Sequence, residues 1–372
     1  SYNFIMTVTS ATEQTKEVDV TLDINDVSNE FIFEVLAGSI GTIDIVLNDG
    51  KHETQYDTYS FTVKRDDEVA QEFNNLGTFT YRYIPLIETE DALTETQRFT
   101  IAPDDVDGLP AFRFNANQGD SDVKIKIIQW GDNSWNTLQE MLAPLCDEDR
   151  NSDSLFFAGP HDSPNLSRVN NAAVFFAGCH LTGSLNYWDV SNIKDMGGAF
   201  VNTKGSTDLS QWDVSSVNDM GNMFKNASNF NSDLSLWDVS SVKYMQEMFG
   251  RAKVFNSDLS LWDTSSVNDM EEMFKFTEKF NADISGWNVS LVKDMKNMFE
   301  SAEVFNADIS KWNTMSVENM NYMFYNAKVF DQDISGGNGI GWDVTKVTSC
   351  TQFKFNAILS SVNTPTFTNC SM

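Results

Sequence analysis

A column of aspartates with the potential to bind cations or polar ligands recurs through the second half of the chain. Its members are Asp208, Asp233, Asp258, Asp283, Asp308 and Asp333, spaced 25 residues apart. A serine follows each of them two residues later. If the 25-residue units stack, adjacent carboxylates approach to about 5 Å. Their repulsion would be about 1 kcal/mol per pair in water and several times larger near a protein surface, so we expect a compensating interaction.

Two kinds of interaction could offset this repulsion. Serine hydroxyls and backbone N–H groups of the adjacent unit can donate hydrogen bonds to the carboxylates, and a row of Ca²⁺ ions can bind oxygen ligands of this kind. The Gly-rich nonapeptide of calcium solenoids is missing, which favours hydrogen bonding. We therefore predict no cofactor, with Ca²⁺ at the aspartates as the alternative. The candidate binding residues form a polar stripe: Asp208, Asp233, Asp258, Asp283, Asp308, Asp333, Ser235, Ser260, Ser285, Ser310, Asn256, Asn281 and Asn306.

The aspartates belong to a sequence repeat marked by tryptophan. Tryptophans stand at 188, 212, 237, 262, 287, 312 and 342, so the spacing is 24, then 25 four times, then 30. The unit reads F-N-x-D-[LI]-S-x-W-[DN]-[VT]-x-x-V-x-x-M-x-x-M-F. A period of this length is typical of solenoids, in which each unit buries its apolar face against its neighbours. Such a chain is largely committed to building a surface, which favours binding over catalysis.

One unit predicts a strand followed by a short helix. Residues 255–260 alternate between apolar or small and polar side chains, as in a strand. Val267, Met270, Met273, Phe274 and Thr277 follow at helical spacing. A strand and a helix in 25 residues predict a leucine-rich-repeat-like solenoid of about seven 25-residue units.

The recurring Met, Phe and Trp residues of the repeat are expected to lie in the interior. The Met pairs have helical spacing, and thioethers fill irregular interiors, which favours packing over a metal or cofactor box. Tryptophan is expected to be partly buried at a turn, with a stacked ledge for sugar rings as the less favoured alternative. The residue after each Trp is Asp or Asn. Tolerance of both predicts an Asx turn or a helix cap rather than a charge requirement.

The first third of the chain predicts a separate β domain. Strand-like segments cover 4–9, 17–24, 30–36, 42–47, 58–64, 78–84 and 97–101, with turn signals between them. We predict an immunoglobulin-like β-sandwich that serves as a mounting domain over 1–114. A cap of the solenoid is expected over 115–180, with a strand at 123–130 and a short helix at 135–143. The repeat solenoid is expected over 181–357 and a C-terminal cap or tail over 358–372. A glycine-rich insertion at 336–341 predicts a flexible loop, with a binding loop as the alternative.

Charge and cysteine content limit the partners. There are 54 acidic and 25 basic residues, a net charge of −29, which disfavours nucleic acid and anionic membranes. No apolar run is long enough to span a bilayer, and the first residues lack signal-peptide features. Four cysteines are too few for a disulfide scaffold, and Cys179 and Cys350 are expected to be buried thiols, while a Cys350–Cys370 pair is conceivable.

The repeat resembles the BspA-like bacterial surface repeat family, whose 25- to 26-residue repeats of unknown function occur in Mycoplasma and Listeria surface lipoproteins. The resemblance lies in Trp-Asp-Val-Ser-Ser-Val-x-x-Met-x-x-Met-Phe from about 188 to 330, and in an entry segment at 129–135. It covers about 123–357. It implies a leucine-rich-repeat-like solenoid with a surface role in adhesion or recognition, and it brings no catalytic residues. Because no lipoprotein signal or wall-sorting tail is seen, a phage or virus structural protein with the same repeat is the alternative carrier.

These observations predict a non-enzymatic, extracellular recognition or adhesion protein, on a virion or a bacterial cell surface. Its partner would be a protein or glycan on a cell surface, or another structural protein of an assembly; the oligomeric state is unknown. One alternative is a calcium-stabilised structural spacer. Another is a polysaccharide hydrolase using two carboxylates, although the chain has three histidines and no H-E-x-x-H, G-x-S-x-G or P-loop motif.

Overall fold

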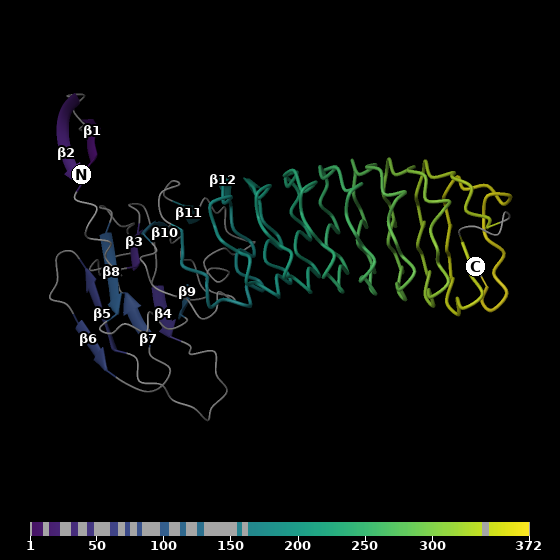
Figure 1. Cartoon of the computed structure of the whole chain (residues 1–372), viewed down its shortest axis with the longest axis horizontal. Helices are drawn as coiled ribbons and strands as arrows, with labels where there is room; N and C mark the ends of the chain where they lie inside the picture. Colours follow the sequence, from purple (N-terminus) through teal and green to yellow (C-terminus); the bar gives the residue numbers. More distant parts are fainter. Residues whose placement is uncertain are drawn as a thin grey trace, which may run out of the picture.

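The structure is a computed structural model, and it describes eleven N-terminal strands together with residues 163–336 and 342–371. The strands are β1 (Tyr2–Thr9), β2 (Thr15–Leu22), β3 (Phe31–Val35), β4 (Ile43–Leu47), β5 (Ser60–Arg65), β6 (Gln71–Asn74), β7 (Thr80–Tyr83), β8 (Gln97–Pro103), β9 (Phe112–Ala116), β10 (Ile125–Gln129) and β11 (Leu155–Phe157). Figure 1 shows them at one end of the chain's long axis. The predicted helix at 135–143 and residues 337–341 of the glycine-rich insertion lie outside the described residues.

The N-terminal strands form mainly antiparallel sheets. β1 and β2 pair as a hairpin, β7-β4-β9 form a three-stranded sheet, and β11-β10-β3-β8-β5-β6 form a six-stranded one. The only parallel pair among these strands is β10 with β11. All seven strand segments expected in the first 114 residues overlap an observed strand, while β6 and β9 were not expected. Alternating Val, Ile, Phe and Thr side chains favour this extended pairing over helix.

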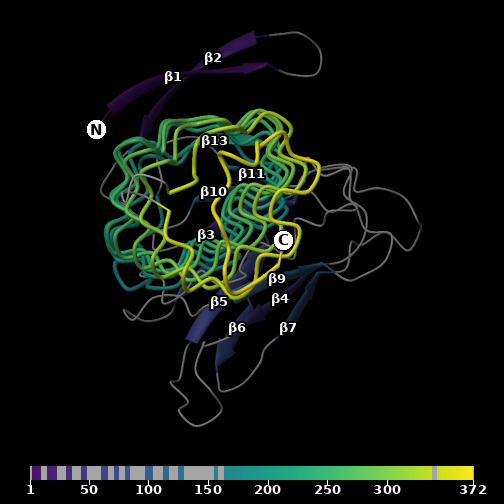
Figure 2. The same ribbon diagram turned by 90° about the vertical axis from the view of Figure 1, so that its right-hand side faces the viewer.

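The repeats lie on top of one another, each forming one rung of a continuous stack (Figure 1). Parallel bridges connect equivalent residues from rung to rung, at Asn171, Asp195, Asp219, Tyr244, Asp269, Asp294, Asn319 and Ser349. Two short strands, β12 (Thr182–Ser184) and β13 (Ser206–Asp208), also pair in parallel. Viewed along the stack, successive rungs superpose around one interior (Figure 2).

The helix expected at 267–277 is wrong, because this segment is a series of overlapping turns. The N–H groups of Met270, Glu272 and Phe274 donate to carbonyls of the next rung, at 2.8–3.0 Å. Met273 and Lys275 donate three positions back within the rung, to the carbonyls of Met270 and Glu272, whereas the Glu271 N–H donates to Oδ1 of Asp269. Backbone donors that a helix would satisfy four residues back are therefore satisfied partly by the next rung.

This turn geometry requires left-handed backbone at two columns. In the described part, every non-glycine residue with positive φ lies either two or six residues after the first Met column, as Asn222 and Asn226 do, both at 59°. Such a conformation favours Gly, Asn and Asp. The two columns contain Gly and Asn in many rungs. A helix and this series of turns therefore both place the Met and Phe residues, spaced three and four apart, on one side. The spacing alone does not distinguish the two structures.

Tryptophan, methionine and phenylalanine fill the interior, as predicted. The paired Met residues from 220 to 323 are fully buried, and Phe249, Phe274 and Phe299 stack across rungs with ring centroids 5.7–5.8 Å apart. The expectation of partly exposed tryptophans is wrong: their exposed fractions are 1–6 %. Each indole N–H from Trp212 onward donates to a Leu or Ile carbonyl of the preceding rung, as Trp262 does to Leu234 at 3.0 Å. The seven tryptophans of the described rungs therefore form no ledge that faces solvent.

The last rung is closed by the chain that follows it. A disulfide joins Cys350 to Cys370, and Phe367 packs edge-on against Phe353 with centroids 5.0 Å apart. Lys354 takes the place of the core phenylalanine and donates to the Leu359 carbonyl and the Thr364 hydroxyl. The prediction of thiols at Cys350 and Cys179 is wrong, because both are disulfide-bonded. Their burial was correctly expected.

Candidate functional site

The predicted aspartates form an exposed column on successive rungs, which we call the exposed Asp column (Asp208, Asp233, Asp258, Asp283, Asp308 and Asp333). In each rung Oδ1 accepts the backbone N–H of the serine two residues on, at 2.9–3.0 Å. The expected compensation by hydrogen bonding therefore exists, and in all six rungs it comes from the same rung; Asp208 also accepts from the adjacent rung, through the Asn186 amide at 2.7 Å. It is an Asx turn repeated six times.

These hydrogen bonds lower the pKa of several carboxylates of the column. The backbone N–H and hydroxyl of Ser235 lower the pKa of Asp233, and the hydroxyl and N–H of Ser285 lower that of Asp283. Ser310 acts in the same way on the pKa of Asp308, against smaller opposing effects of burial and of the Asp283 charge. The predicted serines, Ser235, Ser260, Ser285 and Ser310, thus each donate a backbone N–H to the aspartate of their own rung.

The predicted asparagines perform a structural task beside this column. The side-chain oxygen of Asn231 accepts the Asn256 N–H, Asn256 accepts that of Asn281, and Asn281 that of Asn306, all at 2.7–2.8 Å. A side-chain ladder thus replaces the backbone ladder expected for 255–260, so no strand is formed there. The predicted alternation holds in burial, since Phe255, Ser257 and Leu259 are buried and Asn256 and Asp258 are exposed.

The column after tryptophan is also built from Asx turns, as predicted. Oδ1 of Asp238, Asp263 and Asn288 accepts the N–H two residues on, at 3.0–3.1 Å. Asp and Asn are interchangeable here because only this acceptor is required. The predicted alternative, a helix cap, does not apply, since turns follow.

A third acidic column was missed by the sequence reasoning. It consists of the eight bridge residues given above, and we call it the bridge column. Here too Oδ1 of Asp219 and Asp269 accepts the N–H two residues on, at 2.8 and 2.9 Å. These carboxylates are half-buried, and burial raises the pKa of both, with Asp195 adding to the effect at Asp219 and Asp294 at Asp269.

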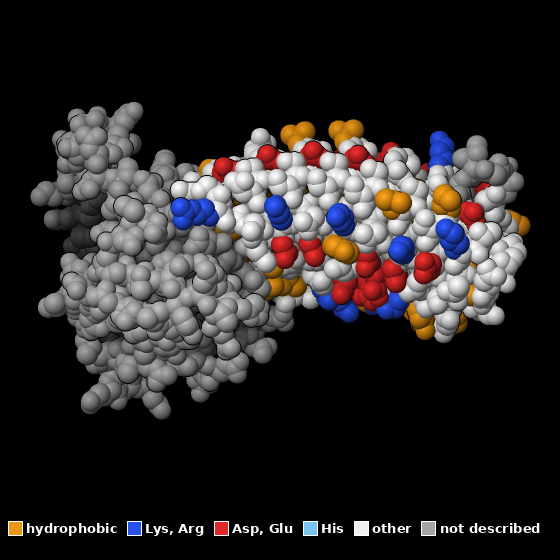
Figure 3. All heavy atoms as spheres, turned by 60° about the horizontal axis from the view of Figure 1, so that its bottom comes forward, with side chains coloured by type: hydrophobic (Ala, Val, Ile, Leu, Met, Phe, Trp, Pro, Cys, Tyr) orange, Lys and Arg blue, Asp and Glu red, His pale blue; other side chains and the backbone are white. Residues whose placement is uncertain are grey.

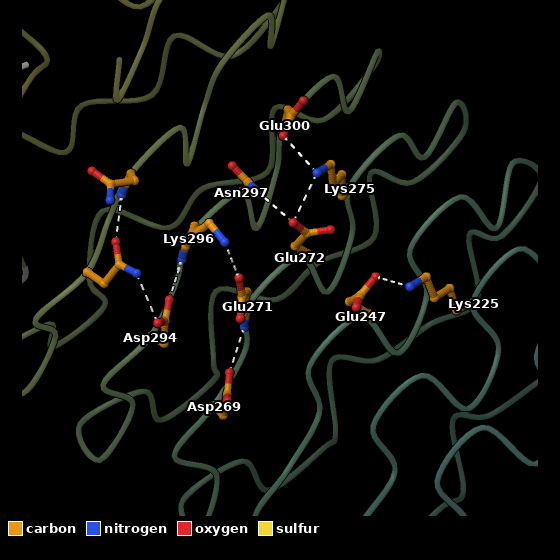
Figure 4. Close-up of polar contacts among 12 residues, drawn as sticks. Lys225, Glu247, Asp269, Glu271, Glu272, Lys275, Asp294, Lys296, Asn297 and Glu300 are labelled. Carbon is orange, nitrogen blue, oxygen red and sulfur yellow. Dashed lines mark hydrogen bonds and ion pairs between the residues drawn. The ribbon is translucent and has the colours of Figure 1, made fainter. Parts of the chain in front are cut away.

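The acids that border the bridge column are paired with lysines. Lys275 lies between Glu272 and Glu300, at 3.0 and 3.2 Å, and Lys296 contacts Glu271 (Figure 4). Lys225 pairs with Glu247 in the same view. Figure 3 correspondingly shows a dense group of acidic and basic side chains together, and elsewhere a spaced row of acidic ones. In the described part, no ion pair within 4.0 Å involves the exposed Asp column.

Two leucines stand out from the surface three residues after aspartates of the exposed column. Leu236 and Leu261, on neighbouring rungs, are 72 % and 77 % exposed. They occupy the position before tryptophan, which is Gln211, Gly286 and Lys311 in other rungs. Side chains at this position do not pack into the interior, so packing does not require the two leucines. They place exposed apolar surface beside the exposed Asp column.

Two classes of site have no support in the described residues. No three His, Cys, Asp or Glu side chains there are grouped so that they could hold a metal ion. In the same part of the chain, no helix is long and apolar enough to cross a bilayer.

The repeats identify the family. The sequence profile described as "Mycoplasma protein of unknown function, DUF285" matches residues 170–275 and 257–366. The two matches run together from 170 to 366, which is 197 of the 372 residues. The chain belongs to this family. The DUF285 region coincides with the stack of rungs and contains the exposed Asp column and the bridge column. No curated protein and no solved structure matched the chain.

Proposed function

We propose that this DUF285 protein is a non-enzymatic recognition or adhesion protein, whose repeat solenoid presents the exposed Asp column to a basic partner. One observation carries the proposal. The acids beside the bridge column are neutralised by Lys225, Lys275 and Lys296, whereas the exposed Asp column has six carboxylates without an ion pair in the described residues. A hydrogen bond from the serine two residues on orients each of these carboxylates. A row of unpaired carboxylates attracts a cationic surface and orients it during association.

The exposed leucines support a protein partner rather than free counter-ions. Leu236 and Leu261 lie within the run of aspartates, and an apolar contact beside charged contacts is the usual composition of a protein interface. We propose as partner a Lys- or Arg-rich protein surface, on a cell or within an assembly.

The setting is proposed from the same features. A BspA-like surface protein and a virion fibre or decoration protein both display a solenoid outside the cell. In either case the N-terminal strands would form an immunoglobulin-like mounting domain, and the solenoid would be the recognition part.

Replacing three aspartates tests the role of the column. Labelled full-length protein would be applied to a panel of bacterial and animal cells, and bound fluorescence measured by flow cytometry. We expect Asp233→Asn, Asp258→Asn and Asp283→Asn together to reduce binding about tenfold or more, with binding that weakens as salt is raised.

A matched variant separates the column from net charge. Asp213→Asn, Asp238→Asn and Asp263→Asn together remove the same three charges from the exposed column after tryptophan, where Asn occurs naturally at 288 and 313. This variant should bind like the parent. Equal loss in both variants would show that only overall charge matters, and binding by neither parent nor variants would exclude the proposed role on these cells.

A further inference from the structure

The last two rungs present an aromatic surface that differs from the rest of the stack. Tyr325 and Phe355, equivalent positions on successive rungs, stack with centroids 5.5 Å apart and an interplanar angle of 18°. Tyr322 meets Tyr325 edge-on at 5.7 Å. Phe355 is 58 % exposed. Unlike the buried tryptophans, these rings lie on the outer surface.

The charge on this face changes along the stack. At the positions of Tyr322 and Tyr325, the two rungs before carry Glu272 with Lys275, and then Asn297 with Glu300. The last two rungs carry no charged side chain at any of the four outward positions that flank the buried Met and Phe, although 21 % of the chain is charged. Amides stand beside the rings instead. The Asn356 amide donates to Oδ1 of Asn326 at 2.7 Å, which holds both side chains next to the rings.

The end of the stack leaves hydrogen-bond donors open beside Phe355. In earlier rungs the N–H groups at the positions of Gln352 and Asn356 donate to the following rung, as Tyr322 and Asn326 do at 2.9 and 2.8 Å. The final rung has no follower, and within the described residues the N–H groups of Gln352 and Asn356 have no acceptor. The closing segment covers Cys350 and Phe353 but leaves these two residues exposed. Figure 2 shows this end facing the viewer.

We infer that this end of the stack is a binding site for a neutral oligosaccharide. The outer face of Phe355 has no ring partner from a following rung, so a pyranose ring can continue the stack with its C–H face against the aromatic face. Sugar hydroxyl oxygens can accept the open N–H groups of Gln352 and Asn356, and hydroxyl protons can be donated to the exposed amide oxygens. A few polar groups around an apolar contact are characteristic of small-ligand sites.

The donor pattern disfavours the simplest competitor, a second copy joined through the same end. The last rung offers N–H donors toward its open side, whereas its carbonyls at Ser349, Thr351 and Phe353 already accept from the rung before. Two identical ends would bring donors against donors. A partner rich in acceptors, such as a saccharide, is the better complement.

Binding of defined saccharides to the full chain tests the inference. The probes are neutral tetrasaccharides of β-1,4-glucose, β-1,4-N-acetylglucosamine, α-1,4-glucose and β-1,4-mannose, measured by saturation-transfer NMR and calorimetry. We expect at least one to bind. Phe355→Leu, which keeps apolar volume but removes the ring face, should lower the affinity about tenfold, as should Tyr325→Ala.

Two controls identify the site. Val362→Ser removes a more exposed apolar side chain of the same end, and Tyr244→Ala removes an exposed ring elsewhere on the stack; both should bind like the parent. The inference is overturned if no probe binds, if Phe355→Leu with unchanged melting temperature binds equally well, or if Val362→Ser loses as much. It is also overturned if the parent self-associates in ultracentrifugation and Phe355→Leu abolishes that association without any saccharide binding. The exposed Asp column occupies other positions of the repeat than Tyr325 and Phe355, so the cell-binding result and the saccharide-binding result can be told apart.

Discussion

The exposed Asp column and the bridge column share one local geometry and differ in what surrounds them. In both, Oδ1 accepts the N–H two residues on. The exposed Asp column carries aspartate on six successive rungs. The bridge column never carries more than two in succession: Asp195 and Asp219 are followed by Tyr244, and Asp269 and Asp294 by Asn319.

Solvent exposure accounts for the difference. Like charges on adjacent rungs repel weakly in water but several times more strongly where water is partly excluded. Burial already raises the pKa of Asp219 and Asp269. Amides stand at the outer ends of the two pairs, since Asn171 donates to Oδ2 of Asp195 at 3.2 Å and Asn319 to that of Asp294 at 3.0 Å. A long run of acids thus marks a surface column and interrupted pairs mark a half-buried one.

The largest change in stability is expected when Tyr244, which separates the two Asp pairs of the bridge column, is replaced by aspartate. Tyr244→Asp would place five aspartates in succession in the bridge column, while Tyr244→Asn supplies a neutral side chain of the same shape. At an effective dielectric of about 20, two unit charges one rung apart repel by roughly 3 kcal/mol. We expect the Asp variant to be about 2 kcal/mol less stable than the Asn variant at pH 7, measured by urea unfolding. Equal stability at low salt would contradict the account of the interruption.

Removing a half-buried charge should have a smaller effect of the opposite sign. Asp269→Asn keeps the acceptor for the Glu271 N–H and removes the charge next to Asp294. We expect a gain of about 1 kcal/mol at pH 7. Because the folded pKa of Asp269 is raised, its charge costs stability above that pKa, and this cost disappears as the pH falls through it. The gain should therefore vanish toward pH 3.5 in urea unfolding; a gain that persists there would have another origin.

The sequence predicted the N-terminal strands, the core columns and the exposed aspartates, because periodicity and burial determine them, but the strand expected at 255–260 is absent. It could not separate a helix from overlapping turns, since both place Val267, Met270 and Phe274 on one side. The available signal was Gly198, Asn222, Asn226 and Asn297 at fixed positions, which favours left-handed backbone. The bridge column was missed because Asp, Tyr, Asn and Ser at one position resemble an ordinary outer face. Its half-buried state depends on contacts between rungs.

Changing the exposed Asp column should have a still smaller effect, opposite in sign to that of Asp269→Asn. Asp233→Asn and Asp283→Asn keep the acceptor but lose a carboxylate whose pKa the serines lower. A lowered pKa contributes stability above the unfolded value of about 3.9, which is lost as the pH falls below it. Because both side chains are exposed, we expect each change to cost a few tenths of a kcal/mol at pH 7. Urea unfolding at pH 7 and pH 3 measures this difference. A clear stabilisation at pH 7 would contradict it, because the exposed Asp column would then respond to loss of charge as the bridge column does.

The smallest expected change in stability is the one caused by calcium. Measuring it tests whether bound cations offset the repulsion within the exposed Asp column. A cation that binds only the folded state at one hundred times its dissociation constant would add about 2.7 kcal/mol of stability. Each exposed carboxylate instead uses Oδ1 for its own serine, and no group of three acids suited to a metal occurs in the described residues. We therefore expect the melting temperature of the full chain to be the same with millimolar Ca²⁺ and with EDTA. If calcium raises it by several degrees, and Asp233→Asn with Asp258→Asn removes that rise, the column is balanced by cations and the serine hydrogen bonds only orient the ligands. An unchanged melting temperature would mean that solvent and the serine hydrogen bonds suffice to offset the repulsion between the carboxylates. The carboxylates would then remain available to a basic partner.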